Sequence, residues 1–170
     1  SQVNADRDVV FIDQRGTGRT GSRCRLADAA SLGLRHTAYD PQGPIAGAHA
    51  KGYRLDANGT LTDTTAWHYG KGADGAIVAN ANDEATFLTA FTDGTLLDPS
   101  SLAELGAGDP SGCSGPLVHS TNGAGDGFKS DVYYAVDGSR VAVLLLNGRT
   151  SGGTEFTRSA AAAASLYCAG

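Results

Sequence analysis

The spacing of apolar positions changes along the first half of the chain, and each change predicts a different element. Residues 8–13 read DVVFID, an apolar run rich in β-branched residues that is typical of a buried strand. Residues 27–34 favour a short helix. Residues 38–65 are rich in Gly, Pro, Asp, Asn and Thr, which predicts a loop. An Asn-Gly pair within residues 56–59 indicates a hairpin turn in that loop.

Two helices are predicted in the middle of the chain. The first begins after Asn80, whose side chain is a suitable N-cap. Its apolar face follows helical spacing and consists of Phe87, Leu88 and Phe91. Asp83 and Glu84 lie in its first turn, where negative charge is favourable. A second, shorter helix begins near Pro99, because proline is well tolerated at the first helical position.

The last third of the chain carries the clearest strand pattern. Residues 131–136 and 140–146 are rich in β-formers and are joined by the hairpin turn Asp-Gly-Ser at 137–139. Residues 116–119 are a shorter candidate strand before them. Residues 154–167 are rich in alanine, the strongest helix former. This order predicts one α+β domain, in which an antiparallel sheet has a C-terminal helix packed across it.

Composition and charge narrow the class of protein. The 170 residues are 41% hydrophobic and 18% charged, which suits one globular domain. The net charge of −5 argues against nucleic acid and anionic membrane surfaces as partners. No apolar run is long enough to span a bilayer, and none resembles a leader peptide. The chain begins with Ser and contains no Met, so we expect a processed product or a fragment.

Histidines and cysteines do not form a metal-binding pattern. The histidines are His36, His49, His68 and His119. The cysteines are Cys24, Cys113 and Cys168. Neither set has the spacing of a metal site, so we expect no metal and no other cofactor. The cysteines are either reduced thiols or, in an exported protein, one disulfide and one remaining thiol.

Several short strings follow one another in a recognisable order after residue 31. They are LGLRHT at 32–37, AHAKGY at 48–53, GAIVANANDEATF at 75–87, LLDPSSLAEL at 96–105, and GF at 127–128 followed by NG at 147–148. Residues 31–170 thereby resemble the C-terminal half of penicillin-binding-fold serine hydrolases, which include serine β-lactamases and D,D-peptidases. The resemblance implies three antiparallel strands that lead into a final helix on the sheet.

The same resemblance implies a disulfide and a binding cleft. Exported members of the family often pair a cysteine before the third motif with one at the end of the last helix, and Cys113 and Cys168 stand at those places. Closing such a loop is worth roughly 4 kcal/mol on the chain-entropy model. Thr121, Asn122 and Gly123 stand where the family has its cleft strand motif. A secreted or extracytoplasmic location follows from the same comparison.

The family's nucleophile motif, Ser-x-x-Lys, is absent from this sequence. The residues three positions before the three lysines (Lys51, Lys71 and Lys129) are Ala48, His68 and Asp126. The Tyr-x-Asn element is absent as well. Because serine hydrolases of this type need an amine beside the nucleophile, we expect the isolated chain not to be an enzyme.

The first residues resemble a different family. Residues 6–19 read DRDVVFIDQRGTGR, which is similar to the strand and turn of α/β-hydrolases of the prolyl-aminopeptidase type. The Gly-x-Ser-x-Gly nucleophile elbow of that family is absent. We therefore expect residues 1–30 to be a strand segment integrated into the domain that residues 31–170 form.

Three functions stay open from the sequence. The first is a non-catalytic domain that binds a peptide or a protein partner at residues 116–127. The second is a fragment of a split serine hydrolase, which another chain completes. The third is a self-sufficient serine hydrolase in which Ser114 or Ser120 pairs with His119. GCSGPLV at 112–118 also resembles the nucleophile loop of chymotrypsin-like proteases, but one Gly is missing, Cys113 replaces the Asp, and no histidine segment of that family precedes it.

Overall fold

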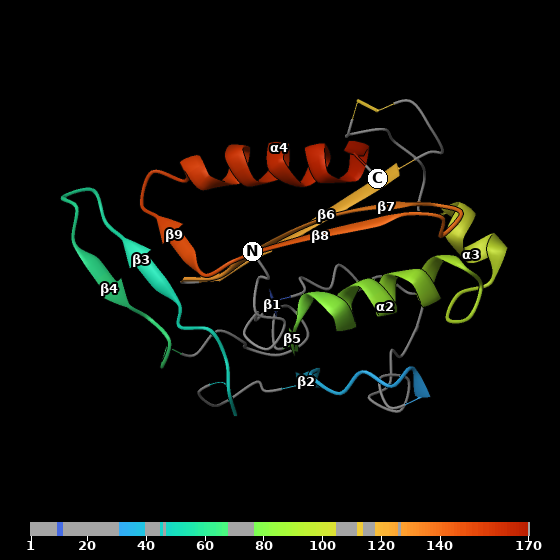
Figure 1. Cartoon of the computed structure of the whole chain (residues 1–170), viewed down its shortest axis with the longest axis horizontal. Coiled ribbons are helices and arrows are strands. Elements are labelled where there is room, and N and C mark those ends of the chain that lie inside the picture. The colour runs from blue at the N-terminus through green and yellow to red at the C-terminus, as the bar shows by residue number, and fades with distance from the viewer. Residues whose placement is uncertain are drawn as a thin grey trace.

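A computed structural model describes residues 10–11, 31–39, 45, 47–67, 77–104, 112–113, 118–125 and 127–169. Its main sheet contains β6 (Val118–Ala124), β7 (Lys129–Ala135) and β8 (Val141–Leu146), in that order and antiparallel throughout. Helix α4 (Thr154–Ala169) covers one face of this sheet, and α2 (Ala81–Thr92) covers the other (Figure 1). The predicted α+β class and the C-terminal helix across the sheet are confirmed.

Helix α4 packs over β7 and β8 through one narrow face. Ser159, Ala163 and Tyr167 are its buried residues, at the i, i+4, i+8 spacing of a helix face. Tyr133 and Ala135 of β7 form a core cluster with Ala163 and Tyr167. The prediction of this helix over 154–167 is confirmed, although its most buried polar position, Ser159, was not foreseen.

Helix α2 packs on the opposite face through Leu88, which contacts Val132 and Tyr134 of β7. Asn80 caps it as predicted: its Oδ1 accepts a hydrogen bond from the backbone N–H of Asp83 at 2.8 Å. The two acidic residues of the first turn differ from each other. Both are buried, but Asp83 accepts hydrogen bonds from residues 36 and 37, whereas Glu84 Oε2 has no hydrogen-bond partner and burial raises the pKa of Glu84 to about 8. The expectation that both acids serve the helix dipole is therefore wrong for Glu84.

Two smaller sheets flank the main one. One has the order β1-β5-β2, with β1 at Val10–Phe11, β5 at Ile77–Ala79 and β2 at Ala38–Tyr39. The other has the order β4-β3-β9, with β4 at Leu61–Asp63, β3 at Tyr53–Leu55 and β9 at Gly148–Thr150. The β3–β4 hairpin confirms the predicted turn. Strands β2, β5 and β9 were not predicted, and α3 (Pro99–Glu104) confirms the second helix.

Two of the recognised strings meet in space at Phe128, which is fully buried. A Cβ on Gly52 would lie 2.5 Å from the ring of Phe128, and one on Gly127 would lie 2.1 Å from Thr64 Oγ1. Gly127 also has a φ of +113°, which favours glycine. The AHAKGY and GF strings therefore contain glycines because the β3–β4 hairpin packs directly on the turn between β6 and β7.

A disulfide joins Cys113 to Cys168, with a Cα–Cα distance of 5.7 Å and a sequence separation of 55. It ties the segment before β6 to the last turn of α4, as the resemblance implied. Cys24, most of the N-terminal strand and residues 27–30 of the helix predicted over 27–34 lie outside the described residues. Of residues 31–34, only Ser31 is helical. Among the helices that the structure describes, none has the length and apolar character needed to cross a membrane.

Candidate functional site

Strand β6 forms one edge of the main sheet. It pairs with β7 so that Ser120 lies opposite Tyr133 and Asn122 lies opposite Asp131. The backbone N–H of Gly125 donates to Phe128 O at 3.0 Å, which sets the alternation of the ladder. Positions 119, 121 and 123 therefore bond to β7, and the N–H and C=O groups of Ser120, Asn122 and Ala124 point away from the sheet.

The side chains of β6 alternate between the two faces, which divides the predicted cleft residues. Ser120, Asn122 and Ala124 lie on the α4 face and are exposed. Thr121 is half-buried and Gly123 is buried, both on the α2 face. The N–H of Gly123 also donates to Ser130 Oγ at 3.0 Å. Of the three residues Thr121, Asn122 and Gly123, only Asn122 thus offers an exposed side chain.

A groove runs alongside α4 on the same face. It is about 700 Å³ in volume and open to solvent, and its lining residues are Tyr133, Ala160, Ala161, Ala164, Ser165, Cys168 and Ala169. Tyr133 lies directly opposite Ser120 in the sheet, so the groove adjoins the exposed face of β6. The space remains because the α4 residues beside its buried face are alanine and serine, whose short side chains do not fill the gap between the helix and the sheet. No sequence pattern indicated the groove.

The described part of the structure does not show a pair formed by the catalytic candidates Ser114, His119 and Ser120. Ser114 and the side chain of His119 lie outside the described residues, so a pair of these two stays a prediction. Positions 119 and 120 are consecutive in β6, and consecutive strand positions lie on opposite faces of a sheet. Ser120 therefore does not share a face with position 119, which gives a Ser120–His119 pair no support.

Both lysines that the structure describes are occupied by carboxylates. Lys51 Nζ lies 3.2 Å from Asp63 Oδ2 on the surface. Lys129 Nζ lies 2.5 Å from Asp131 Oδ2 inside the protein, where the two side chains are 1% and 6% exposed. The contact is an ion pair with poor hydrogen-bond alignment, since Asp131 Oδ2 has no well-aligned donor. Neither amine is placed to activate a serine on β6.

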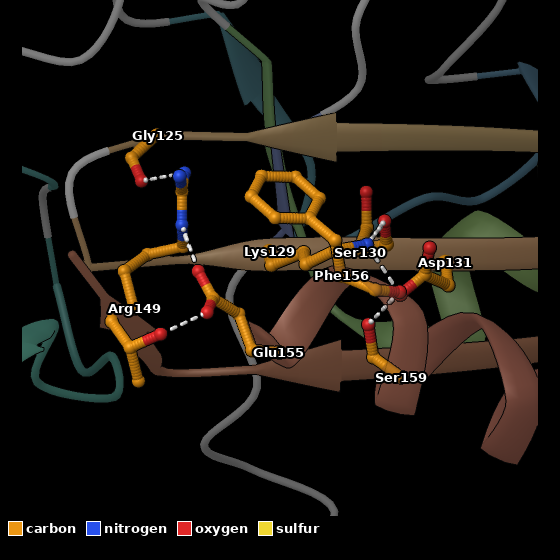
Figure 2. A network of polar contacts seen from close by, with 9 residues as sticks. Gly125, Lys129, Ser130, Asp131, Arg149, Glu155, Phe156 and Ser159 are labelled. Carbon is orange, nitrogen blue, oxygen red and sulfur yellow. Dashed lines mark hydrogen bonds and ion pairs between the residues drawn. The ribbon is translucent and has the colours of Figure 1, made fainter. Parts of the chain in front are cut away.

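A polar cluster next to this pair joins three parts of the fold (Figure 2). Arg149 Nε donates to Glu155 Oε1 at 2.8 Å, and Arg149 NH1 donates to Gly125 O at 2.9 Å. Thr150 Oγ1 donates to the other oxygen of Glu155. The Arg149 guanidinium stacks over Phe156, 4.5 Å from the ring centroid. These contacts clamp the β6–β7 turn, β9 and the start of α4 together.

The clamp keeps Glu155 ionised. Desolvation works in the opposite direction, but hydrogen bonds from Thr150, from the backbone and from Arg149 outweigh it and lower the pKa of Glu155 to about 2. Because its contacts link β9, the start of α4 and the β6–β7 turn, we assign the cluster a structural role. No group of three or more possible metal ligands occurs among the residues that the structure describes.

Neither a family model nor a curated protein sequence matches this chain. Solved structures do match it. The chain is similar to the D-stereospecific amidohydrolase from Streptomyces sp., with a TM-score of 0.60 and 22% identity over 69% of this chain and 41% of that chain. It is similar to the penicillin binding protein from Bacillus halodurans, with a TM-score of 0.56 and 16% identity over 79% and 46%.

A third similar structure is the D-amino acid amidase from Ochrobactrum anthropi complexed with L-phenylalanine amide. The TM-score is 0.53 and the identity 22%, over 81% of this chain and 49% of that chain. The chain therefore spans less than half the length of these three proteins. This chain therefore has a partial penicillin-binding fold. The similar structures, the main sheet with its terminal helix and the strings that carry the resemblance all agree on this.

Proposed function

We propose that this chain binds an extended peptide along the free edge of β6 and does not hydrolyse it alone. The observation that carries the proposal is the row of outward backbone groups at Ser120, Asn122 and Ala124, which no other described residue pairs with. An extended peptide that adds to a sheet edge gains main-chain hydrogen bonds, and adjacent pockets select its side chains. The groove beside Tyr133 is such a pocket.

The peptide class is suggested by the similar structures. Two of them are named for D-stereospecific amide hydrolysis or D-amino acid amides, and one for penicillin binding. We therefore propose a peptide that ends in D-amino acids, of the kind found in peptidoglycan. The Cys113–Cys168 disulfide supports an oxidising, extracytoplasmic location, since disulfides persist in such compartments.

A peptide that ends in D-alanyl-D-alanine and carries a fluorescent label tests the proposal. We expect saturable binding by fluorescence anisotropy, and we expect Asn122→Pro to weaken it about tenfold, since a lost hydrogen bond that leaves a partner unpaired costs about 1–3 kcal/mol. Proline removes the outward N–H of Asn122 and keeps the ladder to β7, because edge strands tolerate proline there.

The matched control for this measurement is Val143→Pro, which changes an outward N–H on the opposite edge of the sheet. It should bind the peptide like the unaltered protein. Equal weakening by both variants, or no binding at all, would contradict peptide binding at β6.

The non-catalytic part of the proposal has its own test. We expect no turnover of a chromogenic cephalosporin and no covalent labelling by a fluorescent penicillin, because the sequence has no Ser-x-x-Lys and Lys129 is held by Asp131. Intact-mass measurement checks for an acyl adduct. An adduct on Ser114 or Ser120 would contradict the non-catalytic assignment and favour the self-sufficient hydrolase.

A split serine hydrolase is the second candidate. It is favoured by the short coverage of the similar structures, of which this chain spans 41–49%. In that case another chain supplies the Ser and Lys. Native mass spectrometry of the purified material separates the two candidates, because a lone monomer of 17.3 kDa contradicts the split enzyme.

A further inference from the structure

Strand β8 forms the opposite edge of the main sheet from β6. Its sequence is VAVLLL, and all six residues are half-buried. The backbone N–H of Ala135 donates to Arg140 O at 2.8 Å, so every second residue from Arg140 onward bonds to β7. The N–H and C=O groups of Val141, Val143 and Leu145 therefore point outward, and among the described residues no strand pairs with them.

Within the part of the chain that the structure describes, strand β8 has none of the usual edge protection. Edge strands are normally kept apart from other chains by charged residues, proline, a bulge or a covering element. Strand β8 contains only apolar residues in a regular ladder of six pairs with β7. An unprotected apolar edge of this kind favours pairing with another strand.

Apolar side chains lie above and below the edge, beside the Arg140 guanidinium that contacts Tyr167 at its start. On the α2 face, a buried cluster of Leu88, Val132 and Tyr134 is surrounded by four partly buried apolar residues, which are Phe87, Phe91, Val141 and Val143. On the other face, Leu166 of α4 is 55% exposed. Ala160 and Ala164 lie on the groove flank of α4, beside Tyr133. Helix α4 runs in the same direction as β7 (Figure 1) and turns Ser159, Ala163 and Tyr167 toward the sheet. In a right-handed helix placed in this way, the flank that carries Leu166 lies toward β8.

The similar structures contain enough additional chain to supply a covering strand. They extend well beyond the part that this chain matches, by more than half of their length. A penicillin-binding fold completed by another polypeptide needs a docking surface on this chain, and the apolar edge of β8 is flanked by apolar surface on both faces of the sheet.

We propose that β8 and the Leu166 flank of α4 dock a separate, complementing polypeptide through an apolar β-strand that pairs with Val141, Val143 and Leu145. The occupant has apolar side chains on both faces, which contact Phe91 on one side and Leu166 on the other. This surface lies on the other edge from the peptide site at β6, and it does not depend on whether the assembled protein hydrolyses anything.

The probe is a fluorescein-labelled peptide of about eight residues, the length of a long strand, with alternating valine and threonine and a lysine at each end. We expect saturable binding to the full chain. Val143→Pro should weaken it about tenfold by removing one outward donor while the ladder to β7 stays intact. Leu166→Lys should weaken it about fivefold, because the strand then loses an apolar neighbour.

Two controls separate this proposal from peptide binding at β6. Leu61→Lys changes another exposed leucine, on β4, and Asn122→Pro changes the other sheet edge, so both should bind the probe like the unaltered protein. No saturable binding, or unchanged binding by Val143→Pro, overturns the proposal. A dimer that light scattering detects and Val143→Pro dissociates overturns it too, in favour of a second copy of this chain at the edge. Thermal unfolding verifies that each variant is folded.

Discussion

Replacing Glu84 by glutamine should stabilise the protein by about 4 kcal/mol near pH 8.5 and by less than about 0.5 kcal/mol near pH 4. Glu84 lies in the first turn of α2 and is 3% exposed, and its Oε2 has no hydrogen-bond partner. Burial without compensation raises the pKa of Glu84 to about 8. The carboxyl is therefore protonated at neutral pH.

The direction of the pH dependence follows from the raised pKa. The folded protein holds this proton up to a pH of about 8, whereas the unfolded chain releases it near the ordinary value of 4.5. The folded state therefore loses stability as pH rises through this interval, and the loss is complete above the folded pKa. Glutamine has the same shape and no charge to desolvate, so its stability should not follow this curve.

Urea unfolding of both proteins across this pH range measures the difference. Asp93→Asn is a control of opposite sign, because hydrogen bonds from Thr95 lower the pKa of the exposed Asp93 carboxylate. Its small effect should appear at neutral pH and vanish in acid. Parallel pH curves for Glu84→Gln and the unaltered protein would contradict the assignment of a buried, protonated Glu84.

Replacing Lys129 by methionine should cost about 3–5 kcal/mol, because it leaves the Asp131 charge buried without a partner. Lys129 is enclosed beneath α4, with Asp131 at 2.5 Å and the Phe156 ring centroid at 4.9 Å from its Nζ (Figure 2). The amine also donates to Ser130 O at 3.4 Å. The loss of stability arises mainly because the Asp131 carboxylate stays buried without a partner, and only to a smaller extent because the attraction between the two charges is removed.

The double variant Lys129→Met with Asp131→Leu separates these two causes. We expect it to recover most of the lost stability, since buried ion pairs are often replaced by apolar residues at little cost. Guanidinium unfolding of the two single variants and the double variant gives the coupling. The surface pair Lys51–Asp63 is the control, and Lys51→Met should change stability very little. Additive losses in the buried pair would refute the explanation.

Elements with a strong local signal were predicted well. Helix α2 begins where Asn80 caps it, α3 begins at Pro99, and the β7–β8 hairpin turns at residues 137–139. Each of these depends on contacts within a few residues, such as the hydrogen bond between Asn80 and the Asp83 N–H. Local chemistry of this kind can be read from a sequence because no distant partner is needed.

Short strands were missed because they exist only in pairs. Strands β2 and β5 pair with each other, and β9 pairs in parallel with β3, across almost a hundred residues. None of the three has more than three residues, so none shows an alternation that could be recognised. Their formation depends on partners that the fold brings from far along the chain.

The candidate site was only partly accessible to sequence reasoning. The resemblance predicted a cleft strand at Thr121, Asn122 and Gly123, and the register of β6 shows that Asn122 alone of these three is exposed. Lys129 and Glu84 looked like ordinary charged residues on a strand and a helix. Their burial follows from the packing of α4 and α2 on the sheet, which no local pattern encodes.

Local propensity, spacing and residue identity were enough to establish the α+β class, the terminal helix, the order of the main strands and the absence of Ser-x-x-Lys. The tertiary structure alone decided which backbone groups of β6 and β8 point outward and which charges are buried. These properties arise from strand register and from the helix that covers each face, and both are set by contacts between residues far apart in the chain.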